Sequence, residues 1–123
     1  MVKCASPGCW RWLESTIANE VAIHDDDARL APLRHECTRS GLTAVVGAPL
    51  RFDVGVRIGA LTLTPDGKVT SYTKQYLHSG EDATFAPGSG GPPISVEGET
   101  VALAVCADTG RGEGAGQAKR VDR

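Results

Sequence analysis

Hydrophobic and polar positions alternate most regularly in the middle of the chain. The segment 25–41, DDDARLAPLRHECTRSG, begins with three aspartates, and carboxylates favour a helix start because they stabilise its exposed amide groups. Pro32 then lies in the first turn, where its missing N–H is not needed, and Gly41 can end the helix. The apolar positions recur at helical spacing, at Leu30, Leu33 and Cys37. The pattern predicts one amphipathic helix.

Four apolar segments after this helix have the pattern of strands. Residues 42–50, LTAVVGAPL, form a buried run. Residues 56–64 and 68–77 alternate on either side of Pro65-Asp66-Gly67, a turn signal that predicts a hairpin. Residues 100–106, TVALAVC, are apolar on both faces, which is typical of a strand in the interior of a sheet.

The order of these elements predicts an α/β or mixed α+β sandwich. Residues 83–93, ATFAPGSGGPP, are the loop before the last strand. Large apolar residues become rare after Thr109, so we expect residues 110–123 to be a polar, disordered tail. Residues 1–13 show no periodic pattern either. A chain of 123 residues can form one domain with a real hydrophobic core.

Composition and charge exclude two classes of partner. The formal net charge is −2, and the basic residues cluster only loosely, at Lys119, Arg120 and Arg123, so nucleic-acid binding is not expected. The apolar fraction of 41% contains no run long enough to span a membrane. The N-terminus, MVKCASPGCWRWLE, lacks the apolar core of a signal peptide. We therefore expect a cytoplasmic protein.

Cysteine spacing does not predict a disulfide framework. Cys4, Cys9, Cys37 and Cys106 are irregularly placed, and reduced thiols are the better expectation in a cytoplasmic protein. A small redox or metal-binding protein that uses the first three cysteines is an alternative interpretation. Cys4 and Cys9 do not have the usual zinc-ligand spacing, however, and no second ligand pair follows them. We expect no bound metal.

Several residues in the second half could carry chemistry, each with an ordinary structural alternative. Cys106 ends a predicted strand and is either a small buried hydrophobic residue or a nucleophile, which needs a neighbouring cation or base. Lys74 is either a solvated lysine or a fixed ammonium that stabilises an oxyanion. Glu81 is either a loop carboxylate in water or the charge partner that orients Lys74. His78 is either polar surface or a base.

These residues stand in segments that resemble a known family. YTKQYLHSGE (72–81), FAPG (85–88) and AVCAD (104–108) match, in order and approximate spacing, the motifs of the carbon–nitrogen hydrolase (nitrilase) superfamily. The resemblance implies an α-β-β-α sandwich with a mixed sheet. It also implies that Cys106 is the nucleophile, that Lys74 stabilises the oxyanion and that Glu81 orients Lys74.

The activity that the resemblance implies is hydrolysis of a non-peptide carbon–nitrogen bond. The substrate is a small amide, N-carbamoyl compound or nitrile, the intermediate is a cysteine thioester, and neither a metal nor an organic cofactor is needed. The resemblance leaves a homo-oligomer open. Substrate choice within the family depends on loops, so the motifs name no single compound.

The chain also departs from the family pattern. The general-base glutamate of the family lies in a PEL-like motif near the N-terminus, which this chain lacks, and Glu14 and Glu20 are the acidic residues nearest that place. We expect a partial hydrolase domain over residues 14–109, between a divergent segment 1–13 and the tail 110–123. A frameshifted or fragmentary gene would produce such a chain. The alternative is a non-catalytic fragment that acts as a self-associating or interaction module.

Overall fold

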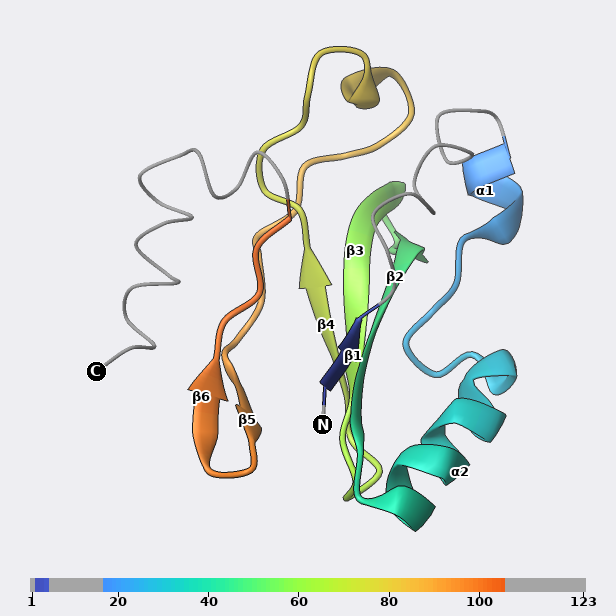
Figure 1. Ribbon diagram of the computed structural model, residues 1–123. Coiled ribbons are helices and arrows are strands. Elements are labelled where there is room, and N and C mark those ends of the chain that lie inside the picture. Colours follow the sequence, from blue (N-terminus) through green and yellow to red (C-terminus); the bar gives the residue numbers. More distant parts are fainter. Residues whose placement is uncertain (1, 5–16, 106–123) are drawn as a thin grey trace.

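The computed structural model describes residues 2–4 and 17–105 (Figure 1). A four-stranded sheet in the order β1-β2-β3-β4 carries helix α2 on one face and the hairpin of β5 and β6 on the other. This mixed sheet with a flanking helix confirms the predicted fold class. The strands are β1 (Val2–Cys4), β2 (Thr43–Arg51), β3 (Val56–Leu63), β4 (Val69–Thr73), β5 (Ile94–Val96) and β6 (Glu99–Val101). The helices are α1 (Ile17–Val21) and α2 (Ala31–Ser40), with 3₁₀ turns at Ala28–Leu30 and Glu81–Ala83.

Helix α2 confirms the helix predicted from residues 25–41. The Asp27 side chain caps the 3₁₀ turn that leads into it, and Pro32 lies in the first turn of α2. Gly41 ends the helix at a φ of 67°, a left-handed conformation that glycine adopts without strain. Leu30 and Cys37 are buried against the sheet. Local sequence therefore determines both ends of this element.

Strands β2, β3 and β4 form an antiparallel meander that confirms the predicted hairpin. The pairing of β2 with β3 runs from Ala44↔Leu63 to Arg51↔Val56. The pairing of β3 with β4 closes at a tight turn, in which Gly67 has a φ of 87° and Thr64 pairs with Lys68. β4 ends at Thr73, earlier than the predicted strand 68–77.

The two faces of the sheet bury different partners because side chains alternate along a strand. Leu61 and Leu63 of β3 pack with Leu30 and Cys37 in the cluster beneath α2. Ala60, on the opposite face, packs with the β5–β6 hairpin in a second cluster. That cluster consists of Val45, Ala60, Ile94 and Val96. The sheet is therefore covered on both faces.

The prediction of one interior strand over residues 100–106 is wrong for the described part of that segment. β6 ends at Val101 and pairs only with β5, in a separate two-stranded sheet. Glu97 and Gly98 both have positive φ values, 51° and 81°, so the chain turns back tightly on itself. Residues 101–105 are half-buried. Cys106 lies outside the described residues.

Two elements near the N-terminus have no counterpart in the predictions. Residues Val2–Cys4 pair in parallel with Thr43–Val45 and place β1 beside β2. The short helix α1 buries Ala18 against the sheet end that contains Val56. Most of the predicted N-terminal segment, and all of the predicted tail, lie outside the described residues. Among the described residues, no helix has the length and apolar character needed to cross a membrane.

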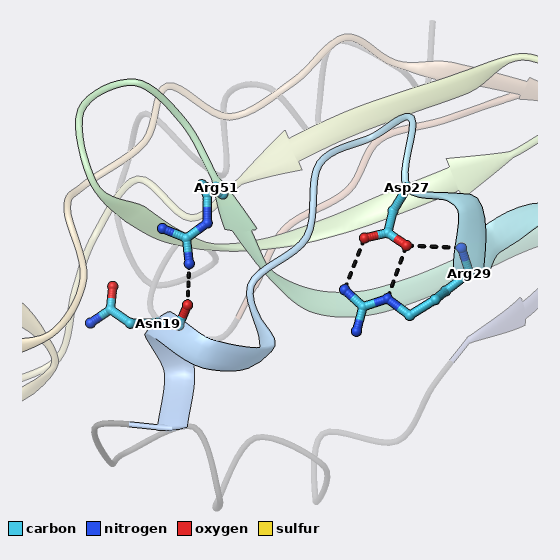
Figure 2. A network of polar contacts seen from close by, with 4 residues as sticks. All are labelled: Asn19, Asp27, Arg29 and Arg51. Carbon is cyan, nitrogen blue, oxygen red and sulfur yellow. Dashed lines mark hydrogen bonds and ion pairs between the residues drawn. The ribbon is translucent and has the colours of Figure 1, made fainter.

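Polar contacts hold the connection between α1 and α2 against the end of β2 (Figure 2). The Arg51 guanidinium donates to the backbone carbonyl of Asn19, and Arg51 N–H donates to the carbonyl of Ile23 at 2.9 Å. Asp27 accepts two hydrogen bonds from the Arg29 side chain, at 2.8 and 2.9 Å, and one from its backbone N–H. The Arg29 side-chain hydrogen bonds lower the pKa of Asp27 from 3.8 to about 2.

The Thr62 hydroxyl is buried and makes no hydrogen bond within the described part of the chain. Replacing it with an apolar group of the same shape removes the desolvation cost. Thr62→Val should therefore raise the free energy of unfolding by about 1 kcal/mol in denaturant titrations. Thr70→Val is the matched control, because Thr70 pairs with Thr62 across β3 and β4 but is half-exposed. A decrease in stability for Thr62→Val would contradict the assignment.

The Asp27 contacts predict a pH dependence of stability. The pKa of Asp27 is lower in the folded protein, so its stabilising effect is complete above 3.8 and is lost as the pH falls towards 2. When the pH is lowered from about 5 to about 2, the melting temperature of Asp27→Asn should fall less than that of the wild type. Asp26→Asn removes a neighbouring charge, and its melting temperature should fall as much as that of the wild type. Circular dichroism melting curves measure both, and equal losses in all three proteins would rule out this contribution.

Candidate active site

Lys74 follows β4 directly, and its main chain is held from both sides. Its N–H donates to the carbonyl of Ile58 on β3 at 2.8 Å, and its carbonyl accepts from Gly88 N–H at 2.8 Å. The residue is 2% exposed, which is rare for lysine. This lysine is therefore a fixed part of the structure rather than the solvated side chain that was its ordinary alternative.

The Lys74 ammonium is paired with Glu81. Nζ lies 2.7 Å from Glu81 Oε2, and the side chains are 2% and 26% exposed. The same carboxylate oxygen accepts the backbone N–H of His78 at 2.9 Å, and Glu81 N–H donates back to the His78 carbonyl at 3.0 Å. The turn from His78 to Glu81 therefore aims the carboxylate at the lysine.

Burial makes this pair strongly interdependent. An ammonium taken out of water loses its hydration, and a close carboxylate offsets much of that loss. An ammonium also has three N–H donors, and the bond to Glu81 uses one of them. The arrangement can hold a cation close to an anion that develops beside it, which is the electrostatic requirement of acyl-transfer chemistry.

An apolar cluster at the same end of the sheet supports the pair. Phe85, 6% exposed, packs with Val56, Ile58 and Ala18. Ile58 is also the residue whose carbonyl holds Lys74 N–H. The composition of residues 83–93 predicted a loop but did not predict that one of its side chains packs into the core. Phe85 is the single aromatic residue of this loop, and that was the one signal that could have identified it.

The structure brings together only part of the predicted set. Lys74 and Glu81 are in contact, whereas Cys106 and Glu14 lie outside the described residues. Glu20 is exposed on α1, and His78 contributes its backbone to the Glu81 turn. In the described part of the chain, no three His, Cys, Asp or Glu residues are arranged to hold a metal ion, and Cys37 is a buried free thiol.

A cavity of about 200 Å³ lies elsewhere, between the α1–α2 connection and the end of β2. Its walls include Ile23, Leu50 and Phe52, with His24 and Asp53 at its rim, and none of the predicted site residues lines it. This cavity therefore gives no support to a substrate pocket beside Lys74.

No protein-family model matches the sequence, and no curated protein matches it. Solved structures do match, and the fold that they share is that of the carbon–nitrogen hydrolase superfamily. XC1258 from Xanthomonas campestris, a CN-hydrolase superfamily protein, is 27% identical with a TM-score of 0.66, and the match covers 76% of this chain and 36% of that one. The predicted resemblance to the superfamily is confirmed.

Amidases are among the matching structures. A mutant of the Nesterenkonia AN1 amidase from the nitrilase superfamily is 27% identical with a TM-score of 0.66, over 87% of this chain and 41% of that one. Another mutant of this amidase, 29% identical over 80% of this chain and 40% of that one with a TM-score of 0.62, records Michael addition of acrylamide at its active-site cysteine. The chain spans about two-fifths of the length of these relatives.

The buried pair predicts an asymmetric response to mutation. Glu81→Gln leaves the buried ammonium without a counter-charge and should lower the free energy of unfolding by about 2 kcal/mol. Adding Lys74→Met to this variant should recover part of the loss, because no buried charge then remains. Denaturant unfolding of the two single variants and the double variant measures the coupling.

Asp82→Asn is the control for this cycle. Asp82 is exposed in the same 3₁₀ turn as Glu81, so its substitution changes the charge equally without touching the lysine. We expect a change within about 0.5 kcal/mol. Strictly additive losses for Lys74→Met and Glu81→Gln would show that the two side chains do not act as a pair.

Proposed function

We propose that this chain carries part of the site of a thiol-dependent carbon–nitrogen hydrolase. Its substrate would be a small molecule with a non-peptide carbon–nitrogen bond, as in an amide, an N-carbamoyl compound or a nitrile. The observation that carries the proposal is the ion pair of the buried Lys74 with the half-buried Glu81, at the two positions that match the motif. The amidases among the similar structures support the same class of reaction.

For an amide, the thiolate of Cys106 attacks the carbonyl carbon, and a carbon–sulfur bond forms as the carbonyl oxygen takes the negative charge. Lys74 Nζ donates a hydrogen bond to that oxygen, while Glu81 fixes the ammonium. A glutamate other than Glu81 takes the proton of the Cys106 thiol and, as a carboxylic acid, delivers it to the nitrogen. The carbon–nitrogen bond breaks, the carbonyl re-forms as a thioester and the amine leaves. Water, deprotonated by the same glutamate, then attacks the thioester; the carbon–sulfur bond breaks, the carboxylic acid product leaves and the proton returns to the cysteine sulfur.

Lys74 suits this role because little rearrangement is needed when the charge develops. Its main chain is fixed between Ile58 and Gly88, and its ammonium is held by Glu81. A cation that is oriented in advance, in a site of low water content, stabilises an oxyanion more than a solvated lysine can. We expect this chemistry to need no metal or organic cofactor. We also expect the protein to be cytoplasmic.

Acrylamide provides a direct test, because a nucleophilic thiolate adds to its terminal carbon. Peptide mass spectrometry after brief exposure should find Cys106 modified about tenfold faster than Cys4 and Cys9. Cys37 is the buried reference. Lys74→Met should slow the modification of Cys106, because the neighbouring ammonium favours the thiolate.

The same variant, Lys74→Met, should lower kcat about 10²–10³-fold on a small amide that proves to be a substrate.

Lys68→Met is the matched control, since Lys68 is an exposed lysine on the β3–β4 turn. It should leave Cys106 unaffected. Equal rates at Cys4, Cys9 and Cys106 would contradict the proposal and favour a non-catalytic interaction module. Thiols that react only after a chelator is added would instead favour a metal site.

A further inference from the structure

The loop from Ala86 to Gly91 lies along the outer edge of β4. Thr73 N–H donates to the Gly90 carbonyl at 3.0 Å, and Gly90 N–H donates to the Thr73 carbonyl at 2.9 Å. Gly88 N–H donates to the Lys74 carbonyl. The loop therefore takes the place of a neighbouring strand at the point where the candidate lysine leaves the sheet.

The hydroxyl of Thr73 adds two bonds to this contact. Oγ1 accepts the backbone N–H of Ser89 at 3.0 Å and donates to the Gly90 carbonyl at 3.3 Å. Thr73 is 4% exposed, and its bond to the Gly90 carbonyl is buried. A buried hydroxyl that uses its donor and its acceptor on one loop fixes that loop in place.

Glycine is required for this approach. A Cβ at Gly88 would lie 2.2 Å from Thr73 Oγ1, and a Cβ at Gly91 would lie 2.7 Å from the Ser71 carbonyl oxygen. Any larger residue at Gly88 would push the loop away from Thr73. The Gly-rich composition of this loop thus has a packing reason at the residue next to Lys74.

We propose that Thr73 is a positioning residue for Lys74, acting through the loop that its hydroxyl holds. The loop supplies the Gly88 N–H that fixes the Lys74 main chain. Loss of the hydroxyl lets the loop rise, and the ammonium then becomes hydrated and loses its fixed direction. This inference rests on the proposed function for the catalytic consequence, but not for the effect on Lys74.

The experiment compares three substitutions at the two ends of this contact. Thr73→Val keeps the shape and removes both hydroxyl bonds, Thr73→Ser keeps the hydroxyl, and Gly88→Ala displaces the loop from its own side. Thr70→Val makes the same chemical change on β4 at a half-exposed residue. Cys37→Ala weakens the apolar cluster between α2 and the sheet, away from the loop, and controls for a general loss of stability.

The first measurement is acetylation of lysines by acetic anhydride, mapped by mass spectrometry with Lys68 as the exposed reference. In the wild type, Lys74 should react far more slowly than Lys68, as its burial requires. Thr73→Val and Gly88→Ala should raise the relative rate at Lys74 about tenfold, and Thr73→Ser should restore it. Equal protection of Lys74 in Thr73→Val and wild type would overturn the proposal.

The second measurement is the rate of acrylamide addition at Cys106 in the same proteins. Thr73→Val should slow it about as much as Lys74→Met does, with rescue by Thr73→Ser. An unchanged rate at Cys106 despite faster acetylation of Lys74 would reduce Thr73 to a structural role and overturn the proposal. A wild type without selective reactivity at Cys106 would overturn the proposed function, whereas the acetylation result would still decide whether Thr73 holds the loop over Lys74.

Discussion

A buried lysine ammonium is the constraint around which one end of this molecule is organised. Lys74 is almost completely removed from water, so a carboxylate must stand beside it, and Glu81 does so at 2.7 Å. The turn from His78 to Glu81 meets that requirement, and Phe85, four residues later, packs into the apolar cluster at the same end of the sheet. Charge and apolar packing thus act together on a segment that has little regular secondary structure.

Different elements cover the two faces of the sheet and its β4 edge. One face is closed by α2, the other by the β5–β6 hairpin, and the edge is closed by a Gly-rich loop. An open strand edge would invite pairing with another chain. A loop that has no side chain at Gly88 covers this edge at Thr73 and Lys74.

Local elements could be predicted from the sequence, whereas the contacts that build the site could not. The helix that ends at Gly41 and the hairpin around Gly67 are determined by residues close in the chain. The strand predicted over residues 100–106 is wrong for its described part, because β6 ends at Val101 and pairs with β5 across a tight turn instead of entering the main sheet. From the residues alone the Lys74–Glu81 contact was one of two alternatives, and the resemblance favoured it, since a separation of seven residues in an irregular segment fixes no geometry. Thr73 carried no signal, because its partners are determined by loop packing.

The parallel pairing of β1 with β2 has a consequence for the order of folding. The β2–β3–β4 meander is made of contacts between neighbours in the chain, whereas β1 joins residue 2 to residue 43 across both helices. Closing so long a loop costs more chain entropy than closing a local hairpin does. The meander can therefore assemble before β1 arrives, and until then the backbone groups of Thr43–Val45 that pair with β1 face solvent. The nascent chain is most exposed to unwanted strand pairing at that edge, opposite the one that the loop protects.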